Sequence, residues 1–195
     1  MKKQAQKIVP AVLLIALVAS LFWVRQESKA KAMVTDLLEG QYQSAFYDLV
    51  GGMEELSILT GKVQYTSSTP KEIQYLTQIS QQSAVALKNL ANLPLEHNSI
   101  TRSGKFLNQL ADYAGVMAQK RISGQDLSET EKENLKALGE QVAEISTDLL
   151  ALQKQLNDEN ILFYSNVEPG SDEDIIGNQF AAIDTRAKDL SLIHI

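Results

Sequence analysis

The side chains that most often catalyse reactions or bind metals are scarce in this sequence. The chain has two histidines and no cysteine, so it cannot assemble the usual sets of Cys and His ligands. His97 stands alone in a polar segment, His97-Asn98-Ser99, where a histidine is expected on the surface. His194 lies among the last six residues and has no other ligand near it. We therefore expect no metal centre.

Acidic clusters are the remaining candidates for catalytic or calcium-binding chemistry. None has the spacing of a calcium-binding loop, and no carboxylate stands in an apolar setting that would raise its pKa for glycoside hydrolysis. Charges at helix starts and on solvated helix faces explain them better. The clusters are Glu54-Glu55, then Glu129 with Glu131 and Glu133, and Asp172-Glu173-Asp174. The sequence therefore predicts no enzyme, and we assign no catalytic, cofactor-binding or metal-binding residue.

An uncharged apolar segment from Ile8 to Val24 determines the predicted location of the chain. As a helix it reaches about 26 Å, slightly less than a bilayer core of about 30 Å. Phe22 and Trp23 at its end suit a membrane interface. We predict that residues 1–25 are a cytoplasmic stub and an uncleaved transmembrane anchor that exports the rest of the chain. A cleaved signal peptide, with Ala30-Lys31-Ala32 as its cleavage site, is the alternative.

The formal charge of -6 is unevenly distributed along the chain. Six basic residues up to Lys31 outweigh Glu27, so this stretch carries +5 and the remainder carries -11. An acidic body offers no cationic stripe for phosphates, which argues against nucleic-acid binding. The acidic body is also expected to be repelled by anionic lipid, so residues 8–24 are the expected membrane contact.

Beyond the anchor, apolar residues recur in steps of three and four, which is the pattern of amphipathic helices. The first predicted helix spans residues 29–63 and continues the membrane segment. Gly51-Gly52 within it is a weak point, a bend or a close helix crossing. Further helices are predicted over residues 70–90, 101–121 and 128–156. The last is the most regular, with Leu135, Leu138, Val142, Ile145, Leu149, Leu152 and Leu156 in alternating steps.

Two helix starts carry recognisable capping residues. Thr69 followed by Pro70 indicates an N-cap with proline at the first helical position. Ser128 and Glu131 have the spacing of a capping box, in which each side chain bonds the backbone N–H of the other residue.

Four amphipathic helices joined by short loops bury their apolar faces most economically as an antiparallel bundle. We predict an all-α fold, in which a single N-terminal transmembrane helix precedes an extracytoplasmic antiparallel bundle of about four helices over residues 26–165. Residues 166–189 are predicted to be a linker and amphipathic segment leading toward a missing C-terminal domain. A longer intermolecular coiled coil, and hence a homo-oligomer, stays open as an alternative.

The final residues 190–195, Leu-Ser-Leu-Ile-His-Ile, look like a translated adapter sequence. We interpret them as a non-native tail on a truncated gene product. A genuine hydrophobic tail is the alternative.

Four short motifs follow one another at characteristic distances. They are Gln41-Tyr42-Gln43-Ser44-Ala45-Phe46-Tyr47-Asp48-Leu49, Asn92-Leu93-Pro94-Leu95, Lys105-Phe106-Leu107-Asn108-Gln109-Leu110 with Asp112-Tyr113, and Leu127-Ser128-Glu129-Thr130-Glu131. In this order, after a short N-terminal anchor, they resemble the N-terminal half of the YpeB family of spore germination proteins. The resemblance spans roughly Val12 to Asp189.

The resemblance implies a non-enzymatic sporulation protein anchored in the inner spore membrane, with its body facing the cortex. Its implied partner is the cortex-lytic enzyme SleB, which needs the family protein to accumulate in the spore and to degrade cortex peptidoglycan during germination. Members of the family continue into C-terminal PepSY-type domains, which this sequence lacks.

A sensory helical bundle of the chemoreceptor or sensor-kinase kind is the alternative function. Such a receptor binds a small ligand and signals through a second membrane span, and no segment after Val24 is apolar for long enough to provide one.

Overall fold

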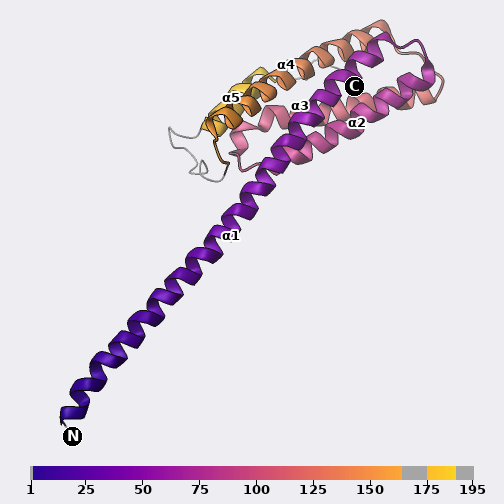
Figure 1. Ribbon diagram of the computed structural model, residues 1–195. Coiled ribbons are helices and arrows are strands. Elements are labelled where there is room, and N and C mark those ends of the chain that lie inside the picture. Colours follow the sequence, from indigo (N-terminus) through magenta and orange to yellow (C-terminus); the bar gives the residue numbers. More distant parts are fainter. Residues whose placement is uncertain (1, 164–174, 188–195) are drawn as a thin grey trace. The chain divides into compact units, whose positions relative to one another are not determined.

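The computed structural model describes residues 2–163 and 175–187, with side chains for residues 33–163 and 175–187. Every regular element in these ranges is helical, which confirms the predicted all-α class. The elements are α1 (Lys2–Tyr65), α2 (Thr69–Ala91), the 3₁₀ helix η1 (His97–Ser99), α3 (Thr101–Ile122), α4 (Glu129–Glu159) and α5 (Ile175–Arg186) (Figure 1). The chain divides into two units, Met1–Gly40 and Gln41–Ile195, which are described separately.

The first unit contains only the N-terminal part of α1. Among the residues that the structure describes, no helix is long and apolar enough to cross a bilayer. The predicted anchor, residues 8–24, falls in the part of α1 whose side chains lie outside the described residues. The acidic cluster at 172–174 and the predicted tail at 190–195 also lie outside them.

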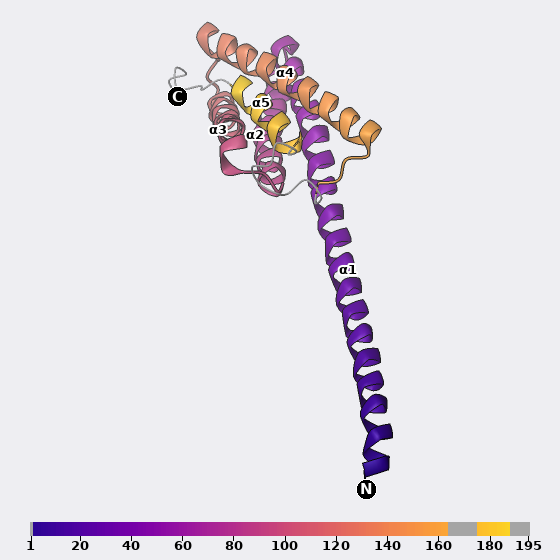
Figure 2. The same cartoon turned by 90° about the vertical axis from the view of Figure 1, so that its left-hand side faces the viewer.

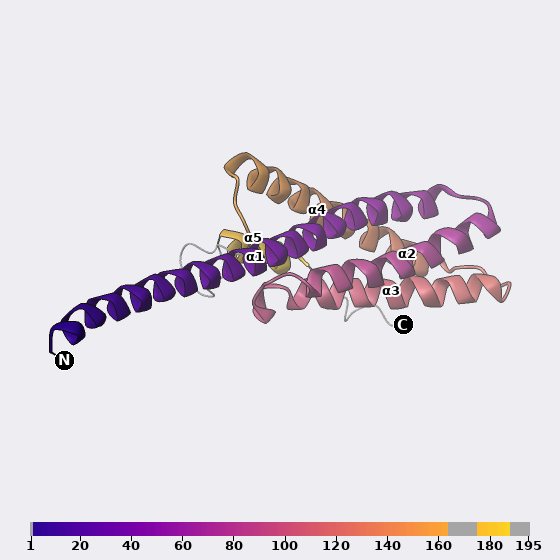
Figure 3. The same cartoon turned by 60° about the horizontal axis from the view of Figure 1, so that its bottom comes forward.

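The second unit is a bundle in which successive long helices run in opposite directions. The part of α1 from Gln41 onward lies on one side with α4, while α2 and α3 lie together on the other side (Figures 2 and 3). The predicted ranges 70–90, 101–121 and 128–156 agree with α2, α3 and α4 to within a few residues at each end, and the helix predicted over residues 29–63 forms the C-terminal part of the longer α1. This arrangement is consistent with the antiparallel bundle expected from the apolar pattern.

The apolar stripe of α4 lies in the core, as its spacing predicts. Each of its seven positions is at most 5 % exposed, namely Leu135, Leu138, Val142, Ile145, Leu149, Leu152 and Leu156. Facing side chains come from the other long helices, with Leu56, Leu76 and Leu110 fully buried. Burial of each such side chain contributes about 1.5 to 3 kcal/mol, which offsets the entropy lost when the chain is ordered.

Glycines allow α1 to pack closely against both α4 and α2. A Cβ atom added to Gly139 of α4 would lie 3.0 Å from the Cβ of Thr60, and one added to Gly52 would lie 3.1 Å from the Nε2 of Gln82 on α2. Of the three interpretations of Gly51-Gly52, the close helix crossing therefore applies to Gly52. The helix α1 continues through the pair without interruption.

The start of α2 differs from the prediction by one residue. The N-cap is Ser68, and Thr69 is the first helical residue, with Pro70 following it. The hydroxyl of Thr69 is used elsewhere, because it accepts a hydrogen bond from the guanidinium of Arg121 at 2.9 Å. The assignment of Thr69 as the N-cap was therefore wrong, since a contact from α3 outweighed the local capping preference.

The capping box that starts α4 is present as predicted. The hydroxyl of Ser128 accepts from the N–H of Glu131 at 3.2 Å, and the carboxylate of Glu131 accepts from the N–H of Ser128 at 2.7 Å. Lys120 of α3 donates to both oxygens of the same carboxylate, at 2.8 and 2.7 Å. The hydrogen bonds from Lys120 and then from the Ser128 backbone lower the pKa of Glu131 below its usual value.

A lowered pKa makes the contribution of Glu131 to stability sensitive to acid. The contribution is complete above the usual glutamate pKa of about 4.3 and is lost as pH falls through the lower pKa of the folded state. We expect Glu131→Gln to lower the free energy of unfolding by about 1 kcal/mol at pH 7 and to reduce its loss on acidification below about pH 4.3. Urea unfolding at pH 7, 5, 4 and 3 measures both effects.

Glu133→Gln is the matched control, because Glu133 is exposed on the same helix and caps nothing. Its stability should follow the wild-type pH dependence. An identical acid response in the Glu131 and Glu133 variants would contradict this role of the capping box.

The last helix, α5, completes the core. Its buried side chains are Ile176, Phe180 and Ile183, and Ala187 just after the helix is buried with them. Phe180 lies 6.0 Å from Phe46 of α1 between ring centroids, and Phe163 lies 5.3 Å from Phe46, so three aromatic rings meet at this place. Residues 166–189 were expected to contain a linker and an amphipathic segment, and the described part of this range is an amphipathic helix packed onto the bundle.

Two polar contacts fix α5 in position. The buried carboxylate of Asp184 accepts a hydrogen bond from the backbone N–H of Ser103 at 2.7 Å. The Nη1 atom of Arg186 donates to both carboxylate oxygens of Asp148 on α4, at 2.7 Å each. Because Ser103 is in the first turn of α3 and the N-cap Ile100 has no capping side chain, Asp184 acts as the cap of α3.

Candidate functional site

The part of the chain that the structure describes brings no metal-binding set of side chains together. His97 is exposed on η1. No set of three or more His, Cys, Asp or Glu side chains within the described residues could hold a metal ion. His194 lies outside the described residues.

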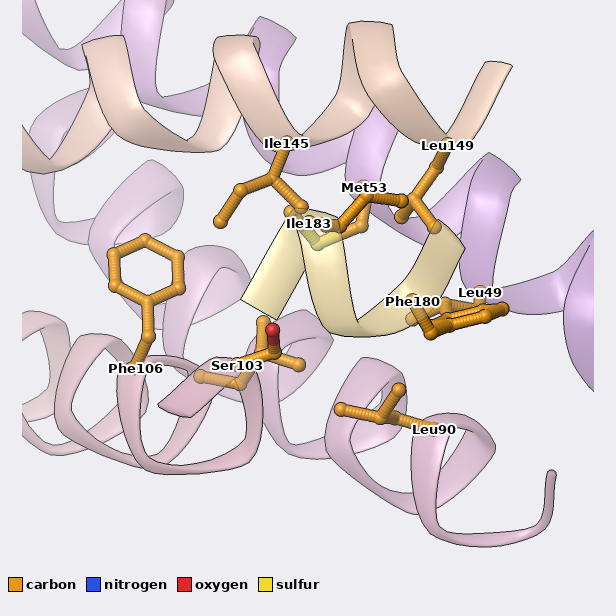
Figure 4. A pocket seen from close by; sticks show the side chains of 10 residues that line it. Leu49, Met53, Leu90, Ser103, Phe106, Ile145, Leu149, Phe180 and Ile183 are labelled. Atoms are coloured by element: carbon orange, nitrogen blue, oxygen red, sulfur yellow. The ribbon is translucent and has the colours of Figure 1, made fainter. Parts of the chain in front are cut away.

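Within the described residues, a small apolar cavity lies in the interior of the bundle close to α5. It has a volume of about 20 Å³ and is lined by side chains from α1, α2, α3, α4 and α5, including Met53, Phe106, Ile145 and Phe180 (Figure 4). A space of this size suits at most a single water molecule, and its apolar walls do not favour one. A metabolite-sized ligand does not fit there.

Charges are distributed unequally over the two sides of the bundle. α4 carries eight acidic side chains and three lysines. α3 carries four basic side chains and one acidic one. The part of α1 within the bundle adds Asp48, Glu54 and Glu55 against Lys62. The side formed by α1 and α4 is therefore acidic, and a basic surface would be attracted to it.

Arg121 joins several elements at the end of the bundle where α3 stops. Its guanidinium donates to the carboxylate of Glu72 on α2 at 2.7 Å and to the hydroxyl of Thr69, and it also pairs with Asp126 in the following loop. The side chain is only 11 % exposed. Because its donors are occupied by groups of the protein itself, Arg121 holds the helices together and does not present a free cation to a ligand.

Helix α3 is also bonded to the start of α4. The hydroxyl of Tyr113 donates to the backbone carbonyl of Glu131 at 3.1 Å, and burial raises the pKa of Tyr113. Two buried atoms, Oε1 of Gln109 and Nε2 of Gln141, have no hydrogen-bond partner within the described residues. Neither glutamine lines the small cavity, so they do not mark a ligand site there.

An open groove lies between α1 and α2. It has a volume of about 550 Å³. From α1 it is lined by Gly51, Glu54, Glu55, Ile58, Leu59 and Lys62, and from α2 by Gln74, Tyr75 and Gln78. The ammonium group of Lys62 lies 5.9 Å from the centre of the Tyr75 ring. We call this recess the α1–α2 groove.

A second open groove, with a volume of about 420 Å³, lies where α1 ends and α4 begins. Its walls include Tyr65, Glu72, Lys132 and Glu133. Glu72 is paired with Arg121 and Lys132 is paired with Glu129, so two of these charges are already satisfied. This groove is therefore a weaker candidate for binding than the α1–α2 groove.

Sequence reasoning assigned Glu54 and Glu55 to a solvated helix face, and both are exposed. It did not single out Gln74, Tyr75 and Gln78, which form the opposite wall of the groove. The available signal was on α1, where exposed Tyr47, Ile58 and Tyr65 recur on the face opposite the core stripe. No local sequence pattern on α2 identifies the residues that form its wall of the groove.

A comparison with known protein families identifies the second unit. The family model described as YpeB N-terminal matches residues 30–165, which include the described helices from the middle of α1 to the end of α4. The chain belongs to the YpeB family. The resemblance noted from the four sequence motifs is thus confirmed.

Curated relatives named sporulation protein YpeB support this assignment. The chain is 24 % identical over 180 residues to the Bacillus subtilis protein, covering 89 % of this chain and 40 % of the relative. It is 22 % identical over 178 residues to the Oceanobacillus iheyensis protein, covering 89 % and 40 %. It is 21 % identical over 148 residues to the Halalkalibacterium halodurans protein, covering 76 % and 33 %. No solved structure matches the chain significantly.

The chain thus spans between one third and two fifths of the length of these YpeB relatives. α5 lies beyond residue 165, where the match to the family model ends. The bundle therefore includes a helix outside the region that the family model describes.

Proposed function

We propose that this chain is the membrane-anchored N-terminal part of a non-enzymatic spore germination protein, whose bundle binds and stabilises the cortex-lytic enzyme SleB. The anchor at residues 8–24 holds the bundle at the inner spore membrane, on the side that faces the cortex. There SleB is kept intact until germination, when it hydrolyses the peptidoglycan of the cortex. The observation that carries this proposal is the match of residues 30–165 to the YpeB N-terminal family.

The form of the bundle supports a binding role. Its regularly spaced apolar side chains are used for cohesion, because they are buried within the bundle. The α1–α2 groove, which is open on the outside of the bundle, is left for recognition. An anchor raises the effective concentration of the bundle at the surface where the lytic enzyme works, which strengthens even a modest affinity.

The interior of the bundle gives no support to the alternative of a small-molecule sensor. A sensor that encloses its ligand needs an interior site of about 300 Å³ or more, and the interior cavity among the described residues has a volume of about 20 Å³. We therefore propose only the partner-stabilising function.

Deletion of the gene for this chain is the direct genetic test. Immunoblots of dormant spores should show a strong reduction of SleB, and germinating spores should release little soluble cortex peptidoglycan. A strain that carries the gene at a second locus is the control and should recover both. Unchanged SleB together with normal cortex loss in the deletion strain would reject the proposal.

A further inference from the structure

One face of α1 is exposed along the whole bundle although it is not fully polar. Within the second unit this outer face consists of Ser44, Tyr47, Gly51, Glu55, Ile58, Lys62 and Tyr65, which recur in steps of three and four. Tyr47 is 42 % exposed, Ile58 is 56 % exposed and Tyr65 is 89 % exposed. A face that only meets water gains nothing from aromatic and branched aliphatic side chains at this spacing.

Gly51 on this face is not explained by packing inside the bundle. A Cβ atom added to Gly51 would meet nothing within 4 Å, whereas one added to Gly52 would meet α2. An exposed glycine inside a helix destabilises that helix relative to alanine. The absent side chain instead lowers the surface one helical turn before Glu54 and Glu55, where a helix from outside could approach the backbone of α1 closely.

The α1–α2 groove lies along the same face. Its α1 wall extends from Gly51 to Lys62, which is about 16 Å or three helical turns. The groove between two packed helices can accept a row of side chains from a third helix. Binding of a helix in such a groove is a common mode of peptide recognition. Length and shape therefore suit one short amphipathic helix.

The charges within the groove define the kind of helix that fits. Glu54 and Glu55 line it and have no hydrogen bond or ion pair within the described residues. Lys62 lies toward the other end, over the Tyr75 ring. A complementary helix carries Lys or Arg opposite the two glutamates, an aliphatic side chain against Ile58, and an acidic or amide group near Lys62.

A second copy of this chain is a poorer occupant. Parallel pairing along the outer face of α1 would place Glu55 against Glu55 and Lys62 against Lys62, so like charges would oppose each other. Antiparallel pairing would match Glu55 with Lys62, but the groove of each copy holds two glutamates and one lysine, so Glu54 of each copy would be left without a cationic partner.

We infer that the α1–α2 groove is the docking site for a single basic, amphipathic helix of the partner protein. This inference rests on the proposed function and specifies which surface performs it. Glu54 and Glu55 attract and orient the basic side chains of that helix, Ile58 supplies the apolar contact, and Gly51 allows the two backbones to approach.

The test is the affinity of purified SleB for the 195-residue chain in detergent micelles, measured by calorimetry. The double variant Glu54→Lys with Glu55→Lys should weaken binding about tenfold or more. Gly51→Leu, which fills the groove at an exposed position, should weaken binding to a similar extent. The matched control is Glu140→Lys with Glu144→Lys on α4, which makes the same charge change at exposed positions and should alter the affinity less than threefold.

Circular dichroism melting curves ensure that each variant is folded, and sedimentation velocity reports self-association. An equal loss in the α1 and α4 double variants would overturn the docking site, because binding would then depend on net charge alone. Self-association of the wild type that the α1 variants abolish would also overturn it, in favour of a second copy. Absence of SleB binding by the wild-type chain would instead count against the proposed function itself.

Discussion

Replacing Phe46 with alanine should lower the free energy of unfolding of the bundle by about 3 to 5 kcal/mol. Phe46 is only 1 % exposed, and its ring contacts the rings of Phe163 and Phe180. The variant loses the transfer free energy of the ring and leaves a cavity where three segments meet. Because the site joins α1 to α5 and to the segment that follows α4, its neighbours cannot all move inward to refill the space.

Chemical denaturation followed by circular dichroism measures this change. Tyr47→Phe on the next residue is the control, because Tyr47 is partly exposed and loses only its hydroxyl bond to Asn157. The control should cost less than about 1 kcal/mol. A loss below 1 kcal/mol for Phe46→Ala would show that the aromatic cluster does not exist in solution.

Replacing Asp184 with alanine should lower the free energy of unfolding by about 2 to 3 kcal/mol. The Asp184 carboxylate is buried and accepts from the N–H of Ser103 in the first turn of α3. Its removal leaves that N–H without a partner in the interior. It also takes a negative charge away from the positive end of the helix dipole.

Amide hydrogen exchange locates this effect within the fold. Protection of the Ser103 amide should fall more than that of amides in the middle of α4, because the cap of α3 is lost first. Asp184→Asn keeps an oxygen acceptor of similar shape and should retain most of the stability. Equal losses in the alanine and asparagine variants would contradict the capping role.

Sequence analysis could predict the helices of this chain because their signals are local. The stripe of α4 repeats within one segment, and the residues of its capping box, Ser128 and Glu131, are only three positions apart. Such patterns reflect the geometry of a single helix, and tertiary packing did not override them. The start of α2 was misjudged by one residue because Arg121, 52 positions away, binds Thr69.

The position of α5 shows why the rest could not be predicted. Its key polar contact joins Asp184 to Ser103, which are 81 residues apart in the sequence. No local sequence pattern near either residue predicts that the two are in contact. From the sequence alone, an acidic residue on a short amphipathic helix is equally compatible with exposure to solvent and with capping the start of another helix. The domain boundary at residue 165 stays a prediction, but the stability of the bundle includes contacts from beyond it.

The α1–α2 groove could not be predicted either, because it also depends on contacts between residues far apart in the sequence. Its walls come from two helices that run in opposite directions, so Ile58 and Gln78 become neighbours only after α1 and α2 have packed. In the sequence, the apolar residues on the outer face of α1 form a second, weaker helical repeat beside the repeat of the core residues. What lies beside them depends on the register between the helices, which Gly52 and Gln82 help to set.

Protection of SleB against proteolysis tests the central claim most directly, because the claim is that the bundle stabilises the enzyme. Purified SleB would be treated with trypsin with and without the 195-residue chain in detergent micelles, and the half-life of intact SleB would be measured. With the chain at 100 times its dissociation constant, cleavage through unfolded SleB should slow by about a hundredfold. The same half-life with and without the chain would contradict the account.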